Sequence, residues 1–218
     1  MLKLGLTGGI ASGKSAVAAM LREKGFAVLD ADALAHQLIQ PGEPAFQEIV
    51  REFDSTNSSS TILDTQGRID RAKLGALVFA DPEKLQRLNA IVHPRVREAM
   101  NHKFARWVQE GTHAAAFVEA ALLVEAGYRD QLDGLWVTFC KPEQQLERLR
   151  ARGLSEDQAN RRIAAQLPVA EKLRYATETI DCSGSLEETR HQVDALIAKI
   201  RAGKISSSAK NSVQRLTP

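Results

Sequence analysis

The stretch Leu2-Lys3-Leu4-Gly5-Leu6-Thr7-Gly8-Gly9-Ile10-Ala11-Ser12-Gly13-Lys14-Ser15 decides the fold of this chain. Its last eight residues fit the pattern G-x-x-x-x-G-K-[ST], and the apolar run before them predicts a buried strand. Glycines let the backbone curl so that successive amide groups point into one concavity, and a helix that begins near Gly13 adds the positive end of its dipole. Strand, loop and helix together predict a phosphate-binding loop, and they disfavour the alternative of a glycine-rich turn with an incidental lysine.

The residues of this loop have separate expected roles. Lys14 is expected to reach the β- and γ-phosphates of a nucleoside triphosphate, and the Ser15 hydroxyl to bind a Mg²⁺ ion that bridges the same oxygens. The residues predicted to contact the nucleotide are Gly8, Gly9, Ile10, Ala11, Ser12, Gly13, Lys14, Ser15 and Ala16.

Length and composition bound the class of protein. The chain has 218 residues, of which 44% are apolar, enough to bury a sizeable core. A formal net charge of +2 argues against nucleic acid as the main partner. Cys140 and Cys182 lack metal-ligand spacing and are expected to be reduced thiols, which predicts a cytoplasmic protein. No apolar run approaches the length of a membrane span, so no membrane association is expected.

Further strands are predicted at residues 27–30, 114–119, 134–139 and, more weakly, 179–182. Because helical patterns alternate with them, we expect an α/β fold with a five-stranded parallel sheet, the core of a P-loop NTPase. This core would comprise residues 1–31, 112–141 and 167–202.

The segment between the second and third predicted strands is too long for a simple crossover and must carry structure of its own. Asp81 caps one predicted helix, and a second is expected from Arg95 to Gln109, because the residue before Pro94 is pushed out of the α region. We expect residues 32–111 to form a helical substrate domain with an exposed polar loop at 55–60.

Two capping boxes predict the last helices. Ser155 with Gln158 opens a helix to Gln166, and Ser185 with Glu188 opens one to Ala202. Residues 203–218 lack periodicity and are expected to be a disordered tail.

Arginines are concentrated before and after the turn at Gly153. Two arginine-bearing helices joined there, within residues 142–166, are expected to close over a triphosphate as a lid. Arg148 and Arg152, four residues apart on one helical face, are the predicted phosphate ligands, and Arg161 and Arg162 follow on the next helix. A solvated helical face is the alternative.

Carboxylates end two of the predicted strands. Asp30 and Asp32 follow the second strand, at the sheet edge that the phosphate-binding loop also occupies, and Asp32 is the candidate base for an alcohol acceptor. Either aspartate can instead only cap the next helix. Glu119 ends the third strand, where an acid can bind Mg²⁺ through water, and Glu125 follows; both can also be ordinary surface acids. His93 is either structural or a substrate contact.

Together these residues resemble the dephospho-CoA kinase family, from Leu4 to about Ala202. Gly5 to Ser15 is close to the family's P-loop, and Asp30-Ala31-Asp32 matches its Asp-Ala-Asp element. Residues 119–125 resemble its pattern Asp-x-Pro-Leu-Leu-Phe-Glu. The family's coenzyme-binding segment and lid are matched by Ile69, Asp70, Arg71, Leu74, Val78, Phe79, Asp81, residues 88–94, Arg148, Arg152, Arg162, Ile163 and Gln166.

This resemblance implies ATP-dependent phosphorylation of the ribose 3′-hydroxyl of dephospho-CoA, with Mg²⁺, to give coenzyme A and ADP. It implies Asp32 as base, Lys14 and Arg148 as further catalytic residues, and Mg²⁺ at Ser15 and, through water, at Glu119. The implied substrate contacts are Asp32, Arg71, Phe79 and His93.

Three positions differ from the family's usual residues: Glu119 stands for aspartate, Ala121 for proline, and Cys182 for an asparagine near the adenine. Two other functions are alternatives for a chain with a phosphate-binding loop. A nucleoside monophosphate kinase is disfavoured by the Asp-Ala-Asp element, and a nucleotide switch by the lack of an Asn-Lys-x-Asp element in the sequence.

Overall fold

The computed structural model describes residues 1–54 and 61–204. The polar loop predicted at 55–60 lies outside these residues, as does all of the predicted tail after Lys204. Among the described residues, no helix is both long enough and apolar enough to cross a membrane.

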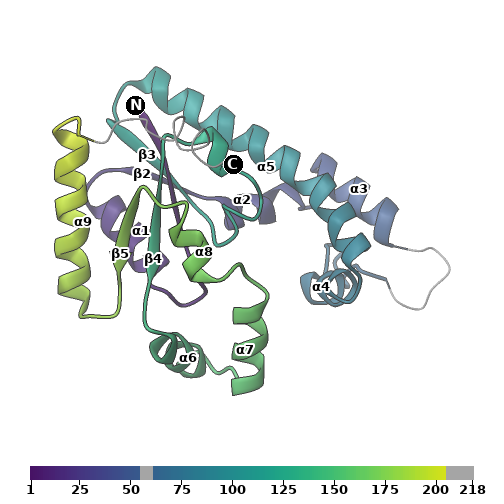
Figure 1. Cartoon of the computed structure of the whole chain (residues 1–218). Helices are drawn as coiled ribbons and strands as arrows, with labels where there is room; N and C mark the ends of the chain where they lie inside the picture. The colour runs from purple at the N-terminus through teal and green to yellow at the C-terminus, as the bar shows by residue number, and fades with distance from the viewer. Residues whose placement is uncertain (55–60, 205–218) are drawn as a thin grey trace, which may run out of the picture. The chain divides into compact units, whose positions relative to one another are not determined.

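A five-stranded parallel sheet forms the centre of the fold, as predicted (Figure 1). The strands are ordered β2-β3-β1-β4-β5. Their bounds are β1 Leu2–Gly8, β2 Ala27–Asp30, β3 Ala115–Glu119, β4 Gly134–Phe139 and β5 Glu178–Asp181. β1 lies between β3 and β4, so the loop that follows β1 emerges at the middle of the carboxyl edge. In open parallel sheets this edge is where ligands bind.

One face of the sheet is covered by α1 (Lys14–Glu23) and α9 (Leu186–Arg201). Leu6, Val17, Phe117, Trp136 and Val193 belong to the resulting core, and all five are buried. α9 stands beside β5 at one side of Figure 1 and begins with the predicted capping box between Ser185 and Glu188. On the opposite face Gly5 leaves room for Leu123, Leu132 and Leu135, whose positions a Cβ there would invade.

The chain divides into two compact units, residues 1–30 with 104–218 and residues 31–103. The second unit is helical and contains α2 (Ala31–Leu38), α3 (Pro44–Phe53), α4 (Arg71–Phe79) and most of α5 (Pro82–Glu110). Its own core is formed by Ala45, Ile49, Phe53, Ile62, Ile69, Leu74 and Val78.

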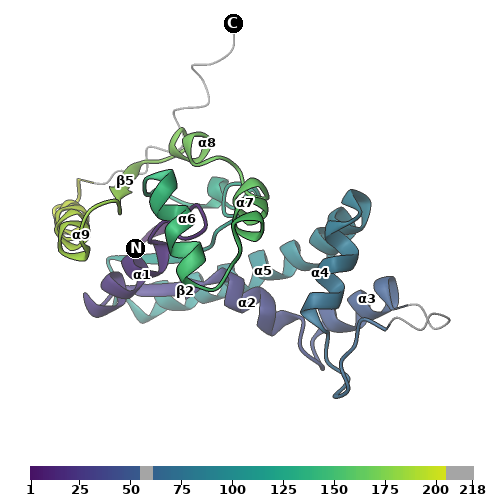
Figure 2. The same cartoon turned by 90° about the horizontal axis from the view of Figure 1, so that it is seen from below.

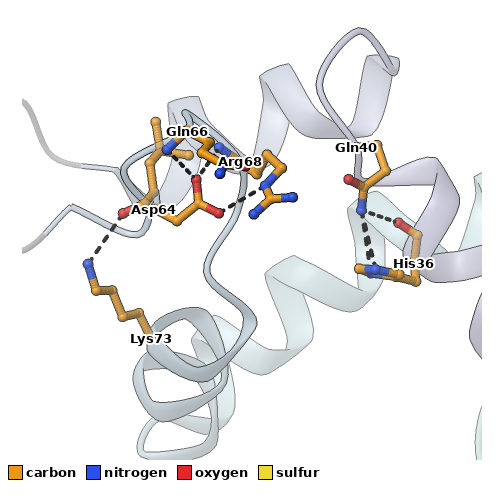
Figure 3. A network of polar contacts seen from close by, with 7 residues as sticks. His36, Gln40, Asp64, Gln66, Arg68 and Lys73 are labelled. Atoms are coloured by element: carbon orange, nitrogen blue, oxygen red, sulfur yellow. Dashed lines mark hydrogen bonds and ion pairs between the residues drawn. The ribbon is translucent and has the colours of Figure 1, made fainter.

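Asp64 organises the loop before α4 (Figure 3). Its carboxylate accepts from the amides of Gln66 and Arg68, at 2.8 and 2.9 Å, and from the Arg68 side chain. Lys73 of α4 donates to the carbonyl of Leu63 in the same loop. The helical unit therefore has polar contacts of its own as well as an apolar core.

The prediction of two helices separated at Pro94 was wrong, because α5 is continuous and contains Pro94. Proline removes one helical donor, but α5 is stabilised by packing on both sides of it. Ile91 packs against the helical core, and Val96 and Met100 are buried. The missing N–H of Pro94 leaves the carbonyl of Ala90 without its helical donor, and the Arg95 guanidinium donates to the next carbonyl, that of Ile91.

The predicted lid helices are α6 (Pro142–Ala151) and α7 (Glu156–Ala164), which lie side by side in Figures 1 and 2. The capping box of Ser155 and Gln158 is present, although α7 ends two residues before Gln166. Leu149 and Ala159 form a small core with Ala11 of the glycine-rich loop. The short helix α8 (Val169–Leu173) follows, and a 3₁₀ turn (Arg129–Gln131) precedes β4.

Candidate active site

The predicted strand, loop and helix are confirmed: β1 ends at Gly8 and α1 begins at Lys14. Gly13 has φ of +99° and forms the N-cap of α1, a conformation that favours glycine. At position 8 a glycine is required for lack of room, because a Cβ there would lie 2.2 Å from the Thr138 hydroxyl. The amide of Ser12 donates to the carbonyl of Gly9 across the turn. The sequence therefore places a tight turn between the end of β1 and the N-terminus of α1, as the predicted phosphate-binding loop requires.

Side chains from behind hold this loop in place. The buried Ser12 hydroxyl lies 2.8 Å from that of Thr138 on β4. Gln145 of α6 donates to the Ile10 carbonyl at 2.6 Å, and the Ile10 amide donates to Gln166 at 2.8 Å. Residues on both sides of α7 thus fix one residue of the loop, which couples the predicted lid to the loop's backbone.

Lys14 and the buried Glu119 form an ion pair at the carboxyl edge of the sheet. The Lys14 ammonium lies 3.0 Å from Glu119 Oε1, and the side chains are 14% and 5% exposed. The other carboxylate oxygen, Oε2, accepts from Arg22 Nη2 at 3.0 Å. Each oxygen of Glu119 therefore has one cationic partner, and the three side chains carry a net charge of +1.

The predicted lid arginines are placed differently from one another. Arg148 donates to the carbonyls of Ala11 and Cys182, at 3.2 and 2.7 Å, so it lies against the loop and the end of β5. Arg152, Arg161 and Arg162 are exposed. Arg148 thus contacts the backbone of the glycine-rich loop, whereas the side chains of the other three arginines are exposed to solvent.

Glu125 serves the fold rather than a metal. It accepts from the Lys172 ammonium at 2.8 Å and from the Leu167 amide at 3.0 Å. Lys172 is fully buried and donates also to the carbonyl of Ala121, at 2.6 Å. This strut ties the loop after β3 to the segment that follows α7.

Oxygen ligands for Mg²⁺ are present beside the loop. Ser15 is exposed in the first turn of α1, and Glu119 supplies a carboxylate at the end of β3. Hydroxyl and carboxylate oxygens are hard ligands of the kind that Mg²⁺ prefers. Within residues 1–54 and 61–204, no cluster of three or more His, Cys, Asp or Glu forms a separate metal site. These residues fit a Mg²⁺ ion that is held largely by nucleotide phosphates.

Asp30 lies opposite Glu119 in the β2–β3 register, at the same sheet edge. Asp32 follows two residues later, in the first turn of α2. Both make polar contacts. Because α2 begins at Ala31, Asp32 lies in the first turn of the helix, and Asp30 directly precedes the helix, where the capping alternative places an aspartate.

The predicted substrate residues Arg71, Phe79 and His93 lie in the helical unit. Arg71 opens α4 and is exposed, and the Phe79 ring at the end of α4 is 77% exposed. His93 is half-buried on α5, and this burial, with Arg97 nearby, lowers its pKa.

Both cysteines are free thiols at the strand ends beside the loop. A Cβ on Gly13 would lie 2.6 Å from Cys182 Sγ, so Cys182 packs directly against the loop. Burial raises the pKa of Cys182 to about 11 and also raises the pKa of Cys140. The residue that stands for the family's asparagine is therefore a buried, protonated side chain at neutral pH.

Sequence reasoning missed Arg22 and Lys172. Arg22 lies eight residues after Lys14, close to the same face of α1, and this helical spacing is the signal that could have found it. For Lys172 the sequence carries no comparable signal, because its partners lie about 50 residues away.

Comparison with known proteins identifies the family. A model of the dephospho-CoA kinase family matches residues 2–188. A dephospho-CoA kinase from Symbiobacterium thermophilum is 48% identical over 193 residues, which cover 88% of this chain and 78% of that protein. This chain belongs to the dephospho-CoA kinase family.

Two solved structures are similar to this chain over most of their length. TT1252 from Thermus thermophilus shares 36% identity with a TM-score of 0.76, covering 91% of this chain and 97% of that one. A dephospho-CoA kinase from Campylobacter jejuni shares 28% identity with a TM-score of 0.69, covering 92% and 98%. As a dephospho-CoA kinase, the chain uses ATP to phosphorylate dephospho-CoA, the last step of coenzyme A biosynthesis.

Proposed function

We propose that the edge of the sheet around residues 8–15 is the place where this chain carries out the dephospho-CoA kinase reaction. One observation carries the proposal: the glycine-rich loop ends in Lys14, whose ammonium lies 3.0 Å from the buried carboxylate of Glu119. A cation held at the N-terminus of α1, beside a curled backbone, suits the triphosphate of ATP.

The donor site is formed by the loop and the start of α1. Lys14 and the loop amides bind the β- and γ-phosphates, and Arg148 and Arg152 add positive charge around the transferred group. Two N–H groups of Arg148 donate to the carbonyls of Ala11 and Cys182. A guanidinium has five such groups, so these bonds leave donors for phosphate oxygens.

Ser15 and, by way of a water molecule, Glu119 would hold the Mg²⁺ ion of this site. When bound, the ion neutralises charge on the phosphate oxygens. The hydroxyl of Ser15 is exposed at the first turn of α1 and would supply one ligand.

The acceptor is the ribose 3′-hydroxyl, and Asp32 is its base. The carboxylate of Asp32 takes the hydroxyl proton, the ribose oxygen bonds to the γ-phosphorus, and the bond to the bridging oxygen breaks so that ADP leaves. Arg71, Phe79 and His93 of the helical unit contact the remainder of dephospho-CoA. The exposed ring of Phe79 is an apolar surface of the kind that a ligand covers.

Asp32→Asn separates the roles of donor site and base. This variant keeps the shape of the side chain, so ATP binding measured by calorimetry should persist while turnover falls by about 10²- to 10⁴-fold. The assay supplies ATP and Mg²⁺ with dephospho-CoA, AMP or adenosine, and mass spectrometry identifies the product. Phosphorylation of AMP with dephospho-CoA untouched would overturn the proposed function, and near-normal turnover of the variant would remove Asp32 as base.

A further inference from the structure

The arrangement around Glu119 contains one cation that the reaction as proposed does not use. Glu119 is almost completely buried, and each of its oxygens has its own partner, Lys14 on Oε1 and Arg22 on Oε2, both at 3.0 Å. Lys14 belongs to the glycine-rich loop. Arg22 lies in the last turn of α1, about 12 Å along the helix axis from Lys14.

Binding of ATP creates an electrostatic problem at this carboxylate. If Lys14 turns toward the phosphates when ATP binds without Mg²⁺, Glu119 loses or weakens its contact on Oε1. A buried carboxylate without a partner is strongly unfavourable, and here it would also face the negative charge of the triphosphate. Lys14 alone would be divided between two anions.

Arg22 is placed to solve this problem. Its guanidinium holds Oε2, the oxygen that Lys14 does not hold, and its backbone lies outside the loop, so the contact does not depend on where Lys14 points. The Arg22 side chain is 45% exposed, which lowers the cost of keeping this cation at the sheet edge.

We propose that Arg22 is a positioning residue that holds the Glu119 carboxylate when Lys14 turns toward the phosphates of ATP. This inference rests on the proposed function for Lys14 but not on the identity of the acceptor. Arg22 acts through Glu119. Its charge neutralises the carboxylate when Lys14 moves away from Oε1, and its contact with Oε2 keeps Oε1 pointing toward the nucleotide.

A double-mutant cycle in ATP binding tests the proposal. Calorimetry with ATP and EDTA measures the affinity of the wild type, Arg22→Gln, Glu119→Gln and the double variant, with no turnover and no metal. Arg22→Gln should weaken ATP binding on the order of tenfold, because Lys14 is then held by an otherwise unpartnered carboxylate. In the Glu119→Gln background the same substitution should change the affinity by less than about twofold.

Two further variants are controls for the loss of a surface arginine and for a loss of stability. Arg190→Gln removes an arginine from a surface pair with Glu23 at the same end of α1, and should leave ATP affinity unchanged. Arg22→Lys keeps the charge and should recover part of the lost affinity, even if Arg22→Gln lowers the melting temperature.

The opposite results are equally clear. An equal loss of ATP affinity in both Glu119 backgrounds would show that Arg22 is only a positive charge near the phosphates, and no loss in either would show that it is a surface residue. Either result overturns the proposal. Failure of the proposed function has a different signature: the wild type would bind ATP normally but would not phosphorylate dephospho-CoA.

Discussion

At the scale of single residues, Lys14 illustrates how one side chain joins function to stability. Its ammonium is a predicted phosphate ligand, yet it also neutralises Glu119, which is buried. The sequence motif alone suggests that removing the Lys14 side chain affects only the binding and use of ATP. The ion pair adds a stability term, since a buried carboxylate that loses one of two partners is destabilised.

Lys14→Ala should therefore abolish most turnover and also destabilise the protein without nucleotide, by about 1–3 kcal/mol. Adding Glu119→Gln should recover part of this stability, because the buried charge is then gone, while turnover stays low. Chemical denaturation and a kinase assay measure the two effects on the same preparations. Normal turnover in Lys14→Ala would contradict the role of the loop, and an unchanged free energy of unfolding would contradict the role of the ion pair.

Cys182 makes the free energy of unfolding depend on pH. Burial raises the pKa of its thiol to about 11 from an ordinary value near 9, so the folded protein binds this proton more tightly than the unfolded chain. The stabilisation is complete below pH 9 and is lost as the pH rises from 9 toward 11. For a shift of this size the loss is about 2–3 kcal/mol.

The fall in the free energy of unfolding between pH 9 and pH 11 should thus be smaller in Cys182→Ala than in the wild type. The variant can be less stable at neutral pH, because its smaller side chain leaves space beside Gly13, but its slope with pH is the relevant quantity. Identical slopes for the two proteins would show that the Cys182 thiolate is tolerated in the folded state.

At the scale of elements, the sequence was most informative where local patterns decide the structure. The strands at 27–30 and 134–139 have the predicted bounds, and both capping boxes are formed. The prediction failed at Pro94, where burial of Val96 and Met100 outweighs a local preference for a break. It also could not foresee that Arg148 would bind backbone carbonyls, since these belong to the glycine-rich loop and to the residue after β5, both distant in the sequence.

The strut between Glu125 and Lys172 is an element-scale feature with an asymmetric cost. Glu125→Gln leaves a fully buried ammonium with weakened compensation, whereas Lys172→Met leaves a carboxylate that is 23% exposed and can be hydrated. Glu125→Gln should therefore lower the free energy of unfolding by more, about 3 kcal/mol against about 1–2 kcal/mol for Lys172→Met.

Arg174→Gln is the matched control for this comparison. It removes an exposed partner of Glu171 in the neighbouring turn and should cost less than about 1 kcal/mol. Urea denaturation of the three variants gives the order directly. A larger loss for Lys172→Met than for Glu125→Gln would mean that packing, rather than charge, decides the role of Lys172.

At the scale of the whole molecule, the residues proposed for ATP and those proposed for the remainder of dephospho-CoA belong to different compact units. The loop and its partners Glu119, Arg22 and Arg148 all lie in residues 1–30 and 104–218, while Arg71 and Phe79 lie in residues 31–103. This division predicts that damage to the helical unit's ligand surface changes acceptor kinetics and leaves ATP binding intact.

Phe79→Ala tests that division. Contacts far from the reacting hydroxyl contribute to catalysis when they are used in the transition state, so loss of this 77% exposed ring should lower kcat/KM for dephospho-CoA about tenfold. The ATP affinity and the melting temperature should stay near those of the wild type, because the ring lies outside the helical core. Leu186→Ala removes an exposed apolar side chain of the other unit and is the matched control.

Adenosine, which lacks the pantetheine arm, should react much more slowly than dephospho-CoA with the wild type. Its kcat/KM should fall less than that of dephospho-CoA in Phe79→Ala. An equal loss for both acceptors would place Phe79 against the adenosine moiety, and no loss for either would remove it from the substrate surface.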